Sequence, residues 1–224
     1  MLKGFWIQNM KAIESIKQFS SVEINKKRLY RRVMQSKSSP PDWLVSEIES
    51  CMGSSSLELK GIYSFFNFYI SKNNDGLLIQ NEKFESRFLA IKFTFAKEVG
   101  LFIITIGDDI TNKAREATKH NDGLQSLIYD SIGSEYAEST ADAMQKVIEK
   151  EKGYCMSRYS PGYNDWPITD QEKLFRLIDG SKIEVNLTKS SFMQPEKSIS
   201  AVIGFSDTKM YGCKNCNQVD CVYR

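Results

Sequence analysis

One short stretch of this chain gathers the residue types best suited to hold a small polar ligand. Residues Cys155 to Pro167 include one arginine, two prolines, one glycine, one tryptophan and two tyrosines. Proline fixes φ and glycine permits positive φ, so Ser160-Pro161-Gly162-Tyr163 is predicted to form a tight, pre-shaped turn. Arg158 carries a permanent charge on a planar fork that suits a carboxylate. Taken alone, the pattern favours a structural turn beside a surface Arg–Glu pair and a core tyrosine.

A second group of reactive side chains ends the sequence. Cys213-x-x-Cys216-x-x-x-x-Cys221 places three thiols at close spacing, and thiolates are preferred by zinc and by iron–sulfur clusters. Cys155 and Cys51 are the candidates for a fourth ligand. The alternative is a reduced tail, or cysteines that only pack.

Composition narrows the class of protein. The 224 residues carry a formal net charge of +2, which indicates neither a nucleic acid nor a membrane partner. No apolar run approaches the roughly 20 residues needed to span a bilayer, and residues 1–10 are too interrupted for a secretory signal. Five cysteines, an odd number, fit a reducing compartment, so we expect a cytoplasmic protein.

The order of predicted elements indicates an α+β fold with a mainly antiparallel sheet. Apolar spacing predicts helices over 7–19, 24–34, 43–51, 123–152 and 171–178, and one beginning near Thr111. Strands are expected over 61–70, 77–79, 101–106, 183–187 and 199–205. We therefore expect a helical N-terminal extension at 1–56, an α+β core at 57–210 and a Cys-rich tail at 211–224.

Three blocks of sequence, in order, resemble one known family. They are Ala137-Glu138-Ser139-Thr140-Ala141-Asp142, Arg158-x-x-x-Gly162-Tyr163, and the segment from Leu187 to Gly204 that reads LTKSSFMQPEKSISAVIG. Together they resemble the activation, or reactivation, domain of cobalamin-dependent methionine synthase. That family has a curved antiparallel sheet flanked by helices, in agreement with the fold expected above.

The resemblance implies a binding site for S-adenosylmethionine. By it, Arg158 anchors the carboxylate of the ligand, Glu138 meets its cationic end, and Gly162 and Tyr163 form the loop that seats it. From the residues themselves, the backbone amides of the Pro161-Gly162 turn are suited to read the adenine edge. The full set of ligand-binding residues implied is Glu138, Arg158, Tyr159, Pro161, Gly162, Tyr163 and Tyr211, where Tyr211 follows the aligned position Met210. No side chain is assigned a catalytic role, because the corrinoid carries the chemistry.

The resemblance also implies a function and partners. We expect a free-standing protein that supports reductive methylation of cobalamin on a separate corrinoid protein or methyltransferase, with a reductase or other electron donor. It is too short to be a complete methionine synthase, and whether it is itself an enzyme stays open. The resemblance gives the C-terminal cysteines no role; from their spacing alone comes the hypothesis that a cluster on Cys213, Cys216 and Cys221 relays the reducing electron. The alternative is a non-catalytic module that senses S-adenosylmethionine and docks on a methyltransferase.

Overall fold

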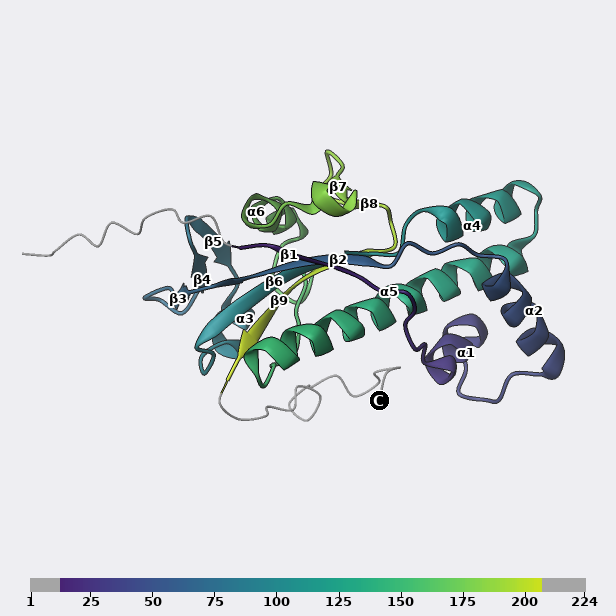
Figure 1. Cartoon of the computed structure of the whole chain (residues 1–224), viewed down its shortest axis with the longest axis horizontal. Helices are drawn as coiled ribbons and strands as arrows, with labels where there is room; N and C mark the ends of the chain where they lie inside the picture. Colours follow the sequence, from purple (N-terminus) through teal and green to yellow (C-terminus); the bar gives the residue numbers. More distant parts are fainter. Residues whose placement is uncertain (1–12, 207–224) are drawn as a thin grey trace, which may run out of the picture.

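The core of the molecule is a four-stranded antiparallel sheet with helices on both faces (Figure 1). A computed structural model describes residues 13–206. The strands lie in the order β1-β2-β6-β9, which are Ser15–Gln18, Lys60–Phe66, Glu98–Thr105 and Ser198–Phe205. Each pairing is antiparallel. This arrangement confirms the predicted α+β class.

Two apolar clusters fill the spaces on either side of this sheet. One joins alternate residues of β2, β6 and β9 to α1 (Lys26–Met34), α2 (Asp42–Gly53), α4 (Asp109–Lys119) and α5 (Gly123–Lys152). The other joins the opposite face to α3 (Arg87–Lys92), α6 (Gln171–Leu177) and a small sheet of β3 (Phe68–Ile70), β4 (Gly76–Ile79) and β5 (Glu82–Glu85). Because β6 is covered on both faces, it reads as a continuous apolar run.

The long helix α5 crosses one face of the sheet and positions several candidate site residues (Figure 1). Asp122 caps its N-terminus by accepting from the Gln125 backbone N–H, and Gly153 ends it at φ 92°. The helix packs closely on β2 at Gly61, where an added Cβ would lie 2.3 Å from Cε of Met144. A side chain at Gly61 would therefore displace the end of the Met144 side chain from its place between α5 and the sheet.

The opposite face carries the short elements that border the loop around Arg158. A 3₁₀ turn, Ile168–Asp170, leads into α6, and a second, Gly180–Ile183, leads to β7 (Asn186–Leu187). β7 pairs with β8 (Met193–Gln194) to form a small hairpin just before β9. None of the described helices is both long and apolar enough to cross a bilayer.

Several expectations for individual elements are confirmed and others are wrong. The helix predicted over 24–34 is α1, with Asn25 capping it through its side chain, and 123–152 is helical throughout. The helix predicted over 7–19 is wrong where the structure describes it, because Ser15–Gln18 pairs with β2 as an edge strand. Pairing with the sheet overrides the weak helical periodicity there. The strand predicted over 183–187 is reduced to Asn186–Leu187, after a 3₁₀ turn.

Candidate functional site

The turn at Ser160–Tyr163 has the fixed shape that its sequence predicts. The Tyr163 N–H donates to the Ser160 carbonyl at 3.1 Å, which closes a four-residue turn. Pro161 occupies its second position and Gly162, at φ 91°, its third. This combination is typical of a type II turn, in which the third residue must have positive φ. Within four residues the chain reverses and leaves the Tyr163 ring 54% exposed.

The same hydrogen bonds correct one expectation about this turn. The Gly162 N–H donates to the Trp166 carbonyl at 2.8 Å, the Tyr163 N–H is used in closing the turn, and proline has no N–H. The amides at Pro161, Gly162 and Tyr163 are thus not available to read an adenine edge. The polar groups that this turn can offer a ligand are therefore its carbonyl groups and neighbouring side chains.

The residues that follow the turn fix it to the rest of the fold. Trp166 is buried and donates through Nε1 to Oδ2 of Asp170 at 3.1 Å. Asp165 accepts from the hydroxyl of Ser86 at 2.5 Å and from the backbone N–H of Arg87 at 3.0 Å, at the first turn of α3. These contacts anchor the C-terminal side of the loop to α3 and to the turn that leads into α6.

The segment before the turn lies along the open edge of β9. Tyr159 and Val202 exchange two backbone hydrogen bonds, of 3.0 and 2.9 Å, and the Met156 N–H donates to Gly204 at 2.8 Å. The chain then turns away, so the first half of β9 continues as an edge strand. Backbone direction alternates along a strand, so Ser198 and Ser200 direct their N–H and C=O groups toward this same edge.

Arg158 reaches α5 and enters a network of acidic side chains. Its Nη1 bonds Asp142 Oδ1 at 2.6 Å and Gln145 Oε1 at 3.2 Å, and its Nη2 bonds Glu138 Oε2 at 2.8 Å. The Arg158 side chain is 20% exposed and the two carboxylates are 37% and 44% exposed. The structure therefore brings together the predicted pair Arg158 and Glu138, as a half-buried ion pair.

The network extends from α5 to α1. Asp142 Oδ2 lies 3.5 Å from Nη2 of Arg28, whose fork also binds Glu135 at 2.6 and 2.8 Å. Glu135 is fully buried, and its hydrogen bonds raise the pKa of the Arg28 guanidinium. Arg32 also lies near, with its Nε 3.8 Å from Glu135 Oε2, so three carboxylates are matched by three arginines in this network. Glu138 and Asp142 are its two more exposed carboxylates and are the ones that a cationic group could reach.

Sequence reasoning missed the partners Asp142, Gln145 and Arg28. A signal for the first two exists: Asp142 and Gln145 follow Glu138 by four and seven positions, which puts all three on one face of a helix. No sequence signal indicates Arg28, because its contact with Asp142 depends on how α1 packs against α5.

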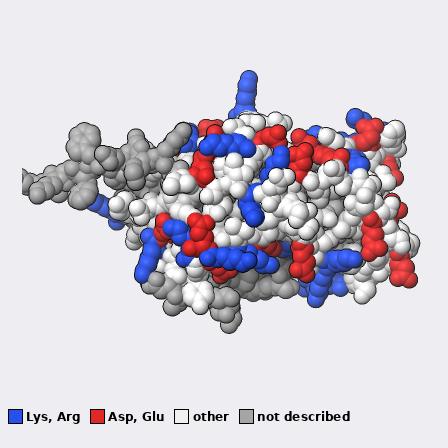
Figure 2. Space-filling model, in the orientation of Figure 1, with Lys and Arg blue, Asp and Glu red and all other residues white. Residues whose placement is uncertain are grey.

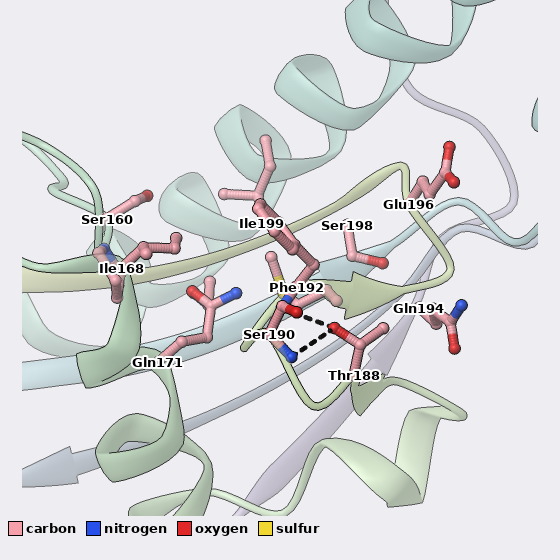
Figure 3. Close-up of a pocket in the computed structure, with 13 residues that line it drawn as sticks. Ser160, Ile168, Gln171, Thr188, Ser190, Phe192, Gln194, Glu196, Ser198 and Ile199 are labelled. Atoms are coloured by element: carbon pink, nitrogen blue, oxygen red, sulfur yellow. Dashed lines mark hydrogen bonds between the residues drawn. The ribbon is translucent and has the colours of Figure 1, made fainter.

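A groove of about 740 Å³ adjoins the turn at the β9 edge (Figure 3). Ser160 and Pro161 form one wall, and the β7–β8 hairpin and the first residues of β9 form the other. Its polar lining comprises Ser160, Gln171, Thr188, Ser190, Gln194, Glu196, Ser198 and Ser200. Gln171 is held in place because its Oε1 accepts from the Ser200 hydroxyl at 2.8 Å. Arg158 precedes Ser160 by two positions, so their Cα atoms are at most about 7 Å apart.

Aromatic rings border the turn on its other side. Tyr159 packs edge-on against Phe88 with centroids 4.9 Å apart, and Tyr163 lies 6.1 Å from each of these two rings. Tyr159 is therefore part of the packing that holds the loop, while the exposed Tyr163 ring is accessible to a ligand.

The predicted metal ligands Cys213, Cys216 and Cys221, and the predicted contact Tyr211, lie outside the described residues. Cys51 and Cys155, the candidates for a fourth ligand, are both buried. Burial raises the pKa of both thiols, that of Cys155 to about 12. Between residues 13 and 206 no cluster of three or more Cys, His, Asp or Glu side chains is arranged to hold a metal ion.

Comparison with known proteins gives one family and one fold. The family model for the vitamin B12 dependent methionine synthase activation domain matches residues 49–222. A solved structure described as the MetH reactivation domain bound to AdoHcy superposes with a TM-score of 0.66 at 15% identity, covering 91% of this chain and 82% of that one. No match to a curated protein is significant. The family model spans most of the sequence, so this chain belongs to the family of vitamin B12 dependent methionine synthase activation domains.

Proposed function

We propose that this protein binds S-adenosylmethionine beside the Ser160–Tyr163 turn and supports reductive methylation of a corrinoid held outside these 224 residues. The observation that carries the proposal is the ion-pair network of Arg158, Glu138 and Asp142, whose arginine precedes by two positions a pre-shaped turn that lines a groove. Membership of the activation-domain family supports the reaction, and the AdoHcy in the solved relative supports the ligand class.

The network matches the charges of the amino-acid end of this ligand. Within the described residues 13–206, Arg158 donates three hydrogen bonds, to Asp142, Gln145 and Glu138. A guanidinium has five N–H groups. The remaining donors would bind the carboxylate of the ligand. Glu138 and Asp142 are more than a third exposed, and would meet its ammonium and sulfonium charges.

The turn and the groove would hold the nucleoside end. Tyr163 offers an exposed π face to a sulfonium or an adenine ring. The hydroxyl and amide side chains of the groove, with the backbone edge at Ser198 and Ser200, would bind ribose and adenine polar atoms. Because the turn amides are already used, we assign base recognition to these groups.

In this proposal the protein supplies binding and orientation. The methyl group must leave the ligand sulfur in line with its acceptor, and fixing that geometry contributes a large part of such a rate. An external electron donor would supply the reduction, and the reduced corrinoid would be the nucleophile that accepts the methyl group. The products would be the methylated corrinoid and S-adenosylhomocysteine.

Calorimetric titration with S-adenosylmethionine tests the ligand, using a matched pair of tyrosine variants. Tyr163 and Tyr154 are 54% and 49% exposed, so neither truncation should affect folding. We expect Tyr163→Ala to weaken binding roughly three- to tenfold, as for loss of one aromatic contact, and Tyr154→Ala to leave it unchanged. Wild-type protein that gives no saturable heat, or equal losses in both variants, would contradict the proposed site.

A second candidate function is a non-catalytic sensor of the same ligand. The observation that favours it is Asp142, which joins Arg158 to Arg28 and therefore the ligand site to α1. Ligand binding that drew Arg158 away from Asp142 would alter the contact with α1, a change that a methyltransferase partner could recognise. Methyl transfer to a corrinoid separates the two functions, since a sensor binds the ligand without consuming it.

A further inference from the structure

The groove beside the Ser160–Tyr163 turn contains a buried amide with unused donors. Gln171, the first residue of α6, lines this groove and is only 3% exposed. Its Oε1 accepts from the Ser200 hydroxyl at 2.8 Å, which fixes the direction in which the amide faces. Neither N–H of its Nε2 has a partner among residues 13–206, and Figure 3 shows this nitrogen on the side of Ser190 and Phe192, across the groove.

The other buried polar side chains of the groove already use their hydrogens. The Ser200 hydroxyl donates to Gln171, and the Ser198 hydroxyl donates to the Pro195 carbonyl at 2.7 Å. Gln171 is therefore the buried side chain of the described lining that can still donate. A buried donor that stays unpaired costs free energy, so this position favours a ligand atom that accepts.

Apolar side chains give the same groove surfaces suited to a flat ring. Five of them line it: Pro161, Ile168, Phe192, Met193 and Ile199. Phe192 is 61% exposed, so its ring is open to pack on the face of another ring. Small-molecule sites commonly combine such apolar walls with a few placed polar groups. A buried amide donor between these walls suits the edge of a nucleobase.

Charge does not select an uncharged base at this groove. Figure 2 shows acidic and basic side chains interspersed over the face of the molecule in view. Within the described lining Glu196 is the one charged residue, and it pairs with Arg115. Discrimination between bases therefore depends on hydrogen bonds at short range.

We propose that Gln171 selects adenine over a 6-oxopurine, by donating from Nε2 to ring nitrogen N1 of the base. The inference rests on the function proposed above and narrows the class of ligand that its groove takes. N1 lies on the edge of the base opposite the sugar. In adenine N1 is an acceptor, whereas in hypoxanthine it carries a hydrogen and would meet the Gln171 donor with a second donor. That mismatch leaves two buried donors unpaired, which is the strongest form of discrimination a hydrogen-bonding site has.

Titration with S-adenosylhomocysteine and S-inosylhomocysteine tests the proposal, because these two compounds differ only at positions 1 and 6 of the base. Calorimetry is applied to wild type, Gln171→Met and Gln194→Met. The last variant removes the same amide from an exposed position of the same lining. We expect wild type to bind the adenosyl compound at least tenfold more tightly than the inosyl compound. Gln171→Met should reduce this ratio to about threefold or less, and Gln194→Met should leave it unchanged.

The outcomes separate this inference from the function on which it rests. Wild type that binds both compounds equally would overturn the inference and leave the proposed function standing, whereas wild type that binds neither compound nor S-adenosylmethionine would contradict both. An unchanged ratio in Gln171→Met, or an equal fall in Gln194→Met, would also overturn the role of Gln171. If Gln171→Met does not fold, Ser200→Ala replaces it, since it releases the amide from the hydroxyl that orients it. An unchanged ratio in Ser200→Ala would then count against the proposal.

Discussion

Replacing Gly162 by alanine tests the claim that the ligand loop is pre-shaped by its backbone. At φ 91° an L-residue is strained, whereas the new Cβ would lie 3.4 Å from the nearest side-chain atom, Cδ1 of Ile168, which is an ordinary contact. The cost therefore comes from the backbone alone. A left-handed conformation costs about 1–2 kcal/mol, and we expect Gly162→Ala to reduce the free energy of unfolding by about that much.

One further glycine position and a second substitution at Gly162 make this measurement specific. Gly53 ends α2 with open space around it and no positive φ, so Gly53→Ala should be neutral or slightly stabilising. Gly162→Asn should lose less than Gly162→Ala, because asparagine tolerates positive φ better. Urea unfolding of the four proteins gives the comparison. A loss for Gly162→Ala no greater than that for Gly53→Ala would refute the strained-turn argument.

Three more predictions concern charge and thiol chemistry. Both carboxylate oxygens of Glu82 bind Arg176, which lowers the pKa of Glu82, so its stabilisation is present above its ordinary pKa and lost as pH falls through the lowered value. Urea unfolding between pH 3 and 7 should show a shallower acid loss in Glu82→Gln than in wild type, and equal profiles would contradict the assignment. Burial raises the pKa of Cys155 to about 12, so its contribution is complete below the ordinary thiol pKa of about 8.5 and is lost above it. Relative to Cys155→Ala, wild type should lose up to about 1.4 kcal/mol of unfolding free energy per pH unit there, and parallel profiles would refute this. Cys213, Cys216 and Cys221 predict bound zinc or an iron–sulfur cluster in protein purified without oxygen, reduced in a Cys213→Ser/Cys216→Ser double variant, and metal-free wild type would exclude such a site.

The sequence predicts those parts of the fold and site that depend on local chemistry. The Ser160–Tyr163 turn follows from proline and glycine at adjacent positions, and the limits of α5 follow from Asp122 and Gly153. Glu138 and Arg158 could be named because two of the sequence blocks that resemble the family carry them, and their direct ion pair corresponds to the surface Arg–Glu pair of the structural alternative. In each case the determining signal is local, at a turn, a helix end or a short sequence block.

Features that depend on tertiary packing could not be predicted in this way. Ser15–Gln18 is a strand because β2 offers it an open edge, and its own sequence contains nothing that requires this. The contacts of Arg28 with Glu135 and Asp142 depend on the placement of α1 against α5. The sequence also could not show that the Gly162 N–H is already used, because its acceptor, the Trp166 carbonyl, is brought to it only by the fold of the loop.

The central claim is tested most directly by following methyl transfer to cobalamin. Hydroxocobalamin, a reductant and methyl-labelled S-adenosylmethionine are incubated with wild-type protein, with Arg158→Lys, or with no protein, and labelled methylcobalamin is measured. Arg158→Lys keeps the charge but loses the fork that binds Glu138 and Asp142 together. The account predicts faster methylation with wild type than without protein, and a clear loss in the variant. Methylation at the protein-free rate, with S-adenosylmethionine bound and unconsumed, would contradict it and favour the sensor.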